Sequence, residues 1–237
     1  MLNELLKQPF SGFTNESLKF LKSLSDPKNN NKQWFDVHRD EYESFLKLPM
    51  RNLIDDLSIQ IKKIDTDIVV NYKSIFRINR DIRFSKDKIP YKNQYSAAFA
   101  FNTVKSAEIP QFYFHFSKDE FLFAAGQYST DNVYAGKIRK AIVDDYKKFK
   151  GIIDDKVFKK EFGSVEGIKL SRLPKGFENY NEMKYDKLLF EFLKMKQFYV
   201  YKTYKPSVVL SEEITEIIIS GIKKSYKFTK FLHNAVK

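Results

Sequence analysis

The sequence predicts a single α+β domain over residues 1–237, with amino-terminal helices packed on a mainly antiparallel sheet and further helices in the carboxy-terminal half. Three observations support this prediction. Apolar residues recur every three or four positions over residues 1–65, which is the spacing of an amphipathic helix. Over residues 70–126 the spacing shortens to two, as in half-buried strands that follow one another closely. Helical spacing returns over residues 130–237, where it alternates with shorter strand-like segments.

Three helices are expected in the first 65 residues. Thr14 offers the side-chain oxygen of an N-cap to the first helix. The apolar stripe of that helix consists of Leu18, Leu21 and Leu24. The second helix begins near Asn31. Pro49 then interrupts the chain before the third helix, because proline lacks the backbone N–H that a helix interior requires.

The first strand is expected over residues 75–84, where apolar and polar side chains alternate. One face would carry the apolar side chains of Phe76, Ile78, Ile82 and Phe84. The opposite face would carry Arg77, Asn79, Asp81 and Arg83. Arg80 is the exception, since the alternation puts its charged side chain on the apolar face.

Further strands are expected at residues 95–103, 111–117 and 120–126. Lys118 and Asp119 form a short turn between the last two, so these two strands are predicted to pair as an antiparallel hairpin.

The carboxy-terminal part is predicted to mix helices with strands. The expected elements are, in order, a helix from Thr130 or Asp131 through Asp145, a helix near 152–161, a strand at 168–173, a helix at about 185–194, a strand at 197–203, a helix at 211–224 and a short terminal helix.

Composition narrows the classes of function. The chain has no cysteine, which excludes disulfides, thiolate chemistry and cysteine-ligated metal sites. No apolar run reaches the length of a membrane span, and the start lacks the pattern of a secretory signal, so we expect a cytoplasmic protein with no membrane partner. The net charge of +12 favours an anionic ligand, a nucleic acid or an acidic surface as partner, although lysine-rich solvated faces would give the same total.

Positive charge is concentrated in one segment. Three of the seven arginines fall within seven residues, as Arg77, Arg80 and Arg83. Arginine supplies a planar, permanently charged fork that can hold a carboxylate or phosphate at two points. Over residues 71–92 seven basic side chains are set against two aspartates, a net charge of +5. We therefore expect this segment to bind a small phosphorylated or carboxylated ligand.

On the expected strand, Arg77 and Arg83 share a face with Asp81 between them, at about 7 Å for each two-residue step. Asp81 would orient both guanidiniums while their remaining donors hold the ligand. The turn that follows is expected to bring four more ligand-binding side chains to the same site. They are Lys86, Lys88, Tyr91 and Lys92.

Two groups are candidates for proton transfer, His115 and Asp81. His115 shares a strand face with Tyr113, and both would line the ligand site if that face also carries the arginines. A lone histidine is also an ordinary buried polar residue. The strand order that decides between these interpretations is not in the sequence.

Arg80 is expected to form a structural ion pair, because a charge on an apolar face needs a partner. The same explanation is open to the whole motif, whose arginines can pair with its own aspartates or with carboxylates of the amino-terminal helices. No metal site and no cofactor are expected. The three histidines lack ligand spacing, and the glycines form neither a phosphate-binding loop nor a dinucleotide fingerprint.

Six short segments of the sequence are distinctive. They are Asn29–Phe35, Phe76–Lys92, Phe112–Phe116, Gly126, Pro174–Phe177 and Lys196–Tyr199. In these segments the chain resembles the conserved family of unknown function called DUF2461, over roughly Phe10 to Leu232. The resemblance implies no activity and no functional residues. At this strand end such proteins often have more glycine than the run Ala124, Ala125 and Gly126 provides, and the two alanine side chains would limit how closely a ligand approaches this backbone.

Three hypotheses about function remain open. The first is that the basic segment binds a small anionic ligand, with enzymatic proton transfer by His115 or Asp81 left undecided. The second is a non-catalytic module that binds nucleic acid or an acidic partner, although the alternation turns the aromatic side chains of the segment towards the core. The third is that the motif is purely structural. The oligomeric state is not predicted.

Overall fold

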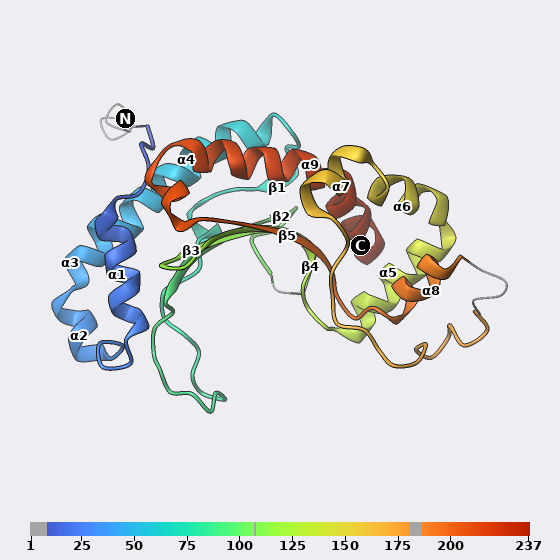
Figure 1. The fold of residues 1–237 in the computed structure, drawn as a ribbon, viewed down its shortest axis with the longest axis horizontal. Helices are drawn as coiled ribbons and strands as arrows, with labels where there is room; N and C mark the ends of the chain where they lie inside the picture. Colours follow the sequence, from blue (N-terminus) through green and yellow to red (C-terminus); the bar gives the residue numbers. More distant parts are fainter. Residues whose placement is uncertain (1–8, 107, 181–185) are drawn as a thin grey trace. The chain divides into compact units, whose positions relative to one another are not determined.

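The computed structural model describes residues 9–106, 108–180 and 186–237. Five strands form one antiparallel sheet in the order β1-β2-β3-β4-β5, so neighbours in the sheet are also consecutive strands along the chain (Figure 1). Helices precede β1, separate β4 from β5 and follow β5. The predicted α+β class, with helices on both sides of a sheet-forming segment, is confirmed.

The elements have the following bounds. The helices are α1 (Asn15–Ser25), α2 (Lys32–Val37), α3 (Arg39–Tyr42), α4 (Leu48–Lys62), α5 (Asn132–Asp144), α6 (Tyr146–Ile153), α7 (Lys156–Phe162), α8 (Lys187–Lys194) and α9 (Glu213–Val236). The strands are β1 (Ile68–Val69), β2 (Gln94–Phe101), β3 (Gln111–Ser117), β4 (Phe121–Gln127) and β5 (Phe198–Tyr204). None of the helices within the described ranges combines the length and apolarity needed to cross a membrane.

The chain divides into two compact units. The first comprises residues up to 104, 113–123 and 203–220, and the second comprises residues 105–112, 124–202 and 221–237. β3, β4, β5 and α9 each contribute residues to both units. The expectation of a single domain stays a prediction.

The amino-terminal helices begin where the sequence predicts. The N–H of Thr14 donates to Ser17 Oγ (3.1 Å) at the start of α1, and Asn31 Oδ1 accepts from the N–H of Trp34 (2.9 Å) at the start of α2. Pro49 does not break the chain as expected. It lies in the first turn of α4, where its missing N–H is tolerated, and a π-helical turn at Glu43–Lys47 precedes it.

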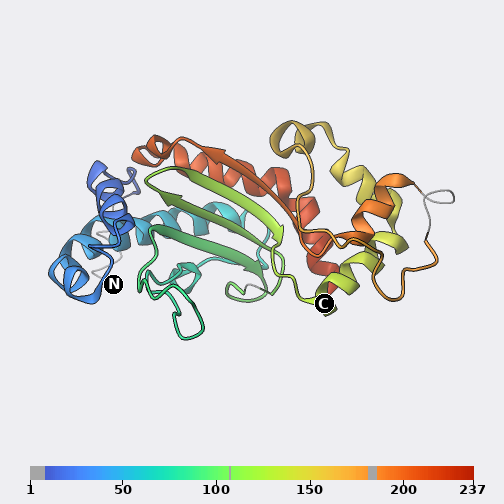
Figure 2. The ribbon, with the colours of Figure 1, turned by 60° about the horizontal axis from the view of Figure 1, so that its bottom comes forward.

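Helix α4 lies along one face of the sheet (Figures 1 and 2). Its side chains Leu53, Leu57 and Ile61 recur at helical spacing and are fully buried. The two-residue alternation expected in β3 is present, since Phe114 and Phe116 are buried on one face. The expected hairpin is also present, closed by a bond from Ser117 N–H to the Glu120 carbonyl (2.9 Å).

The strand expected at residues 75–84 is wrong. The segment makes only isolated bridges, Ile75 with Ala97 and Asn79 with Tyr91. Residues 75–92 instead form a long loop that projects from the sheet, here called the basic excursion (Figures 1 and 2). Alternation of period two also arises where two arms of one loop pair with each other, so the pattern alone does not distinguish the two cases.

Three expectations in the carboxy-terminal part also change. Residues 168–173 are not a strand and make only an isolated bridge, Lys169 with Met195. Residues 152–161 span the end of α6 and most of α7, and one continuous helix, α9, replaces the two expected near the end. The expected helix start at residue 185 lies outside the described residues.

Gly126 is required where β4 approaches β5. Its φ is +118°, and a Cβ added there would lie 2.3 Å from the Phe198 carbonyl oxygen. Only glycine satisfies both the backbone conformation and the close approach.

Candidate functional site

The basic excursion is built from two paired arms. At its root the N–H of Phe76 donates to the Ser96 carbonyl (2.9 Å), which extends the edge of the sheet beside β2. Further out, the Arg80 N–H donates to the Pro90 carbonyl (2.8 Å) and the Lys92 N–H to the Ile78 carbonyl (2.9 Å). These bonds are antiparallel pairs, and they hold the two arms together.

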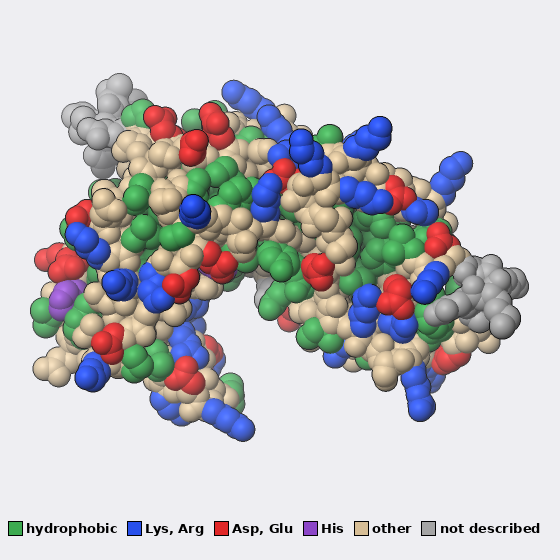
Figure 3. All heavy atoms as spheres, viewed as in Figure 1, with side chains coloured by type: hydrophobic (Ala, Val, Ile, Leu, Met, Phe, Trp, Pro, Cys, Tyr) green, Lys and Arg blue, Asp and Glu red, His purple; other side chains and the backbone are tan. Residues whose placement is uncertain are grey.

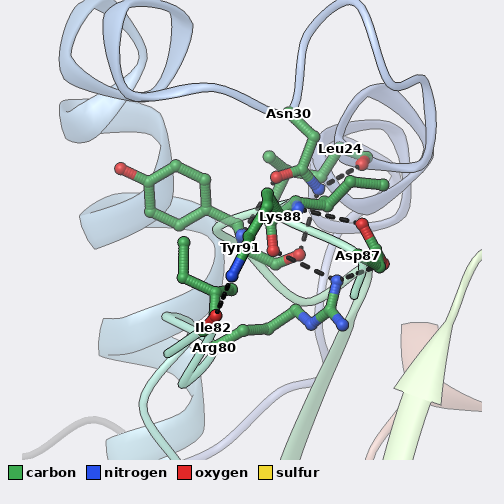
Figure 4. Close-up of polar contacts among 8 residues, drawn as sticks. Leu24, Asn30, Arg80, Ile82, Asp87, Lys88 and Tyr91 are labelled. Carbon is green, nitrogen blue, oxygen red and sulfur yellow. Dashed lines mark hydrogen bonds and ion pairs between the residues drawn. The ribbon is translucent and has the colours of Figure 1, made fainter. Parts of the chain in front are cut away.

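The side-chain amide of Asn30 fixes the returning arm (Figure 4). Asn30 Oδ1 accepts from the Tyr91 N–H (3.0 Å), and Asn30 Nδ2 donates to the Tyr91 carbonyl (3.0 Å) and to the Leu24 carbonyl (2.8 Å). Asn30 is only 6% exposed. The amide thus replaces a strand partner for Tyr91, and it joins the excursion to the end of α1.

The ring of Tyr91, expected to contact a ligand, is part of this packing. It stacks on Phe35 with centroids 4.2 Å apart and planes 12° apart, and it is buried. The Arg39 guanidinium lies 5.6 Å from the centre of the Phe35 ring on α2. Tyr91 therefore anchors the excursion on the amino-terminal helices.

Arg80 holds the base of the tip together. Its Nη1 donates to Asp87 Oδ2 (2.6 Å) and to the Ile89 carbonyl (3.1 Å), as Figure 4 shows for the first contact. Asp87 Oδ1 also accepts from the Ile89 N–H (2.9 Å). This backbone bond, followed by the Arg80 contact, lowers the pKa of Asp87.

Arg83 and Asp81 form a second pair at the tip. Arg83 donates from Nε to Asp81 Oδ1 (3.0 Å) and from Nη2 to Asp81 Oδ2 (2.6 Å), a two-point contact. The guanidinium, and then the Arg83 N–H, lower the pKa of the Asp81 carboxyl. Such a carboxyl is a weak base at neutral pH, which does not favour the proton-transfer role expected for Asp81.

Four cations of the excursion have no carboxylate partner within the described part of the chain. They are Arg77, Lys86, Lys88 and Lys92. Lys88 Nζ donates only to the Ile82 carbonyl (3.0 Å), and Lys92 Nζ donates to the Arg77 carbonyl (2.9 Å). Burial, and then the charge of Arg77, lower the pKa of Lys92. Figure 3 shows Lys and Arg side chains gathered on the projecting loop.

His115 and Tyr113 lie at the root of the excursion rather than at its tip. The Tyr113 ring meets Phe76 at 6.1 Å and His115 at 5.6 Å, and Gln94 Nε2 donates to Tyr113 Oη (3.2 Å). His115 Nε2 is 3.3 Å from Glu120 Oε1. In the ranges that the structure describes, His115 makes no hydrogen bond or ion pair with an arginine.

The His115 imidazole is buried, with 8% of the residue exposed, and its Nδ1 has no partner among the described residues. Burial lowers the pKa of His115, while the hydrogen bond to Glu120 opposes that change. A neutral ring that donates Nε2–H to Glu120 leaves a lone pair on Nδ1. This atom can accept one hydrogen bond from a ligand or from water.

Two residues of this region were not predicted from the sequence. Asn30 lies in a run of three asparagines, and nothing local indicates that its partner is 61 positions away. Phe84 was expected in the core and is 94% exposed. A charged flank on both sides, Arg83 and Lys86, is the sequence signal that could have indicated an exposed ring.

A cavity of about 470 Å³ lies elsewhere, in the second unit. Its lining includes Phe158 and Phe192, together with the ion pairs of Lys159 with Asp154 and of Lys169 with Glu191. It contains none of the predicted site residues. No group of three or more metal-ligating side chains occurs within the described residues.

A family model described as conserved hypothetical protein (DUF2461) matches residues 16–231. A search of curated proteins found no match.

Replacing Asn30 tests its role as the anchor. We expect Asn30→Ala to lower the free energy of unfolding by about 2–4 kcal/mol, because it leaves one N–H and two carbonyls without partners at a buried position. Urea unfolding measures the change. Asn29→Ala is the matched control, since it removes one long contact to the Ser23 carbonyl (3.3 Å), and we expect it to cost less than about 1 kcal/mol. Equal stability of the two variants would contradict the anchoring role.

The buried imidazole predicts a pH dependence. The lowered pKa of His115 means that the unfolded chain binds more protons just below pH 6.5. The free energy of unfolding of the wild type should therefore fall, relative to His115→Gln, as the pH drops below about 6.5 and until the folded-state pKa is passed. Urea unfolding at about pH 7.5, 6.5 and 5.5 measures this difference, above the range where carboxyls titrate. Parallel curves for the two proteins would show that the imidazole titrates normally in the folded state.

Proposed function

The chain belongs to the DUF2461 family of conserved hypothetical proteins, and since that description carries no activity, we propose from the geometry of the excursion that the protein binds an extended, phosphate-bearing polyanion. The observation that carries this proposal is the set of excursion cations without a carboxylate partner in the described structure, Arg77, Lys86, Lys88 and Lys92. They lie on a loop that projects from the sheet.

The ion pairs of the arginines support an extended partner. Two of the three guanidinium groups already pair with aspartates of the excursion, Arg80 with Asp87 and Arg83 with Asp81. The cations that remain are mainly lysines, which attract phosphates as point charges without fixing the geometry of one ligand. Such contacts suit a repeating backbone better than a single small anion.

The exposure of the cations supports the same conclusion. Arg77, Lys86 and Lys88 are exposed, whereas sites for small molecules are concave and enclose their ligand. Proteins that bind polyanions use open basic surfaces instead. None of these three cations forms a salt bridge with a carboxylate of the described chain, although the charge of Arg77 contributes to the lowered pKa of Asp81. A wholly structural motif would not need Lys86 and Lys88.

A small anionic ligand remains a second candidate, at the root of the excursion. One observation favours it, the buried Nδ1 of His115 that has no partner in the described residues. Lys92 Nζ and the Tyr113 ring both lie near Phe76 there, at 5.3 Å and 6.1 Å from the centre of its ring. A ligand whose anionic group is held by Lys92 could present a hydroxyl to the lone pair of Nδ1, and His115 would then be the group available for proton transfer.

The proposal places the protein in the cytoplasm, as the sequence leads us to expect. Its partner there would be a polymer with closely spaced phosphates, and no catalytic step is part of the proposal.

Salt dependence tests the proposal. Four contacts to a single-stranded polyphosphate backbone predict a slope of about −2.8 for log K against log salt, or roughly a 50-fold loss of affinity between 50 and 200 mM. Removing two cations in Lys86→Ala with Lys88→Ala should reduce the slope to about −1.4. Both slopes are measured by fluorescence anisotropy with a labelled single-stranded oligonucleotide of 20 nucleotides.

The matched control is Lys62→Ala with Lys63→Ala, which changes the net charge equally at exposed positions at the end of α4. Its slope should equal that of the wild type. Equal slopes for all three proteins would contradict the proposal. Competition by inorganic phosphate beyond its effect on ionic strength would favour the small-ligand candidate instead.

A further inference from the structure

We propose that the polyanion is single-stranded nucleic acid and that Phe84 is the ring on which one of its bases stacks. This inference rests on the proposed function, which it deepens by naming the partner. Phe84 is 94% exposed, the highest value among the exposed large hydrophobic side chains of the described residues. A phenylalanine side chain stabilises the folded protein only when it is removed from water. The exposed ring of Phe84 therefore contributes nothing to the stability of the fold.

The ring is presented by a folded tip. Next to it, Arg83 and Asp81 form their two-point contact. In the same tip the Ser85 N–H donates to the Ile82 carbonyl (3.3 Å), and Lys88 Nζ donates to the same carbonyl (3.0 Å). A partner that binds here meets a tip already ordered, which reduces the entropy lost on binding.

The surroundings of the ring match the requirements of a nucleotide. The Arg83 guanidinium carbon lies 5.8 Å from the centre of the Phe84 ring, so a planar cation and an aromatic ring are adjacent. Unpaired bases stack on both kinds of group. Lys86 and Lys88 follow within four residues and have no carboxylate partner within the described chain, so phosphates on either side of the stacked base can contact them.

An anionic lipid surface is the other partner with a similar charge, and the tip is less suited to it. Inserting Phe84 into the acyl region would take the adjacent Arg83 and Asp81 charges out of water, which is costly. A base can stack on the ring from the side while that ion pair stays solvated. Phe84 is also a single ring, whereas an interfacial helix buries a continuous apolar face.

The experiment compares two polymers with equal charge. Fluorescence anisotropy would measure the binding of a 12-residue oligothymidylate and of a 12-residue abasic deoxyribose-phosphate chain, at 50 mM salt. We expect the wild type to prefer oligothymidylate. Phe84→Ala should weaken oligothymidylate binding by about 5- to 150-fold and leave abasic binding unchanged, while Phe84→Trp should retain the preference. Ile59→Ala, at an exposed position of α4, is the control and should change neither affinity.

The outcomes separate this inference from the proposed function. If both polymers bind with a steep salt dependence but Phe84→Ala does not change the preference, the stacking role is wrong and polyanion binding stands. If neither polymer binds, both proposals fail. Binding to vesicles of phosphatidylcholine and phosphatidylserine that depends on Phe84, without a preference for bases, would overturn the inference in favour of a membrane surface. Unchanged thermal unfolding of Phe84→Ala confirms that any loss of affinity is not a loss of fold.

Discussion

The side-chain amide of Asn30 is the interaction on which the candidate site depends. By accepting from and donating to the backbone of Tyr91, it acts as a strand partner where the sheet has none. A buried backbone group without a partner costs as much as a lost hydrogen bond, so the returning arm is stable only where this amide meets it. The stack of Tyr91 on Phe35 then adds apolar contact at the same point. The direction in which the excursion leaves the sheet follows from these two contacts.

The ion pairs divide the excursion into residues that hold it together and residues that are exposed to solvent and available to a partner. Arg80 and Asp87 close the arms, and Tyr91 anchors them. Arg77, Lys86 and Lys88 face solvent beside the exposed ring of Phe84. Exposed ion pairs contribute little to stability, so the contact of Arg83 with Asp81 matters for the orientation of the guanidinium more than for the fold. The three earlier hypotheses thus apply to different residues of one motif rather than to the motif as a whole.

Features of the fold that depend on the spacing of residues close together in the sequence are predicted well. The α+β class, the start of a helix near Asn31 and the hairpin at Lys118 and Asp119 follow from periodicity and turn residues, and the structure confirms them. The basic excursion was mistaken for a strand because its two arms pair with each other, which gives the same two-residue alternation. The wrong position of Phe84 follows directly from that error.

The rest of the site could not be predicted because it depends on distant contacts. Asn30 and Tyr91 are 61 positions apart, and no local pattern links an asparagine in a turn to the backbone of a basic loop. The placement of His115 near the root of the excursion likewise required the order of β2 and β3 in the sheet. Residue types in the motif were informative about charge, and only the fold shows which charges are already paired.

Photocrosslinking tests the central claim that the tip of the excursion is the binding surface. A single-stranded oligonucleotide containing 5-iodouracil would be irradiated with the wild-type protein, and the attached peptide identified by mass spectrometry. We predict the main adduct in residues 81–88, at or next to Phe84, and its loss when salt is raised. Adducts confined to other parts of the chain, with none in residues 81–88, would contradict the account.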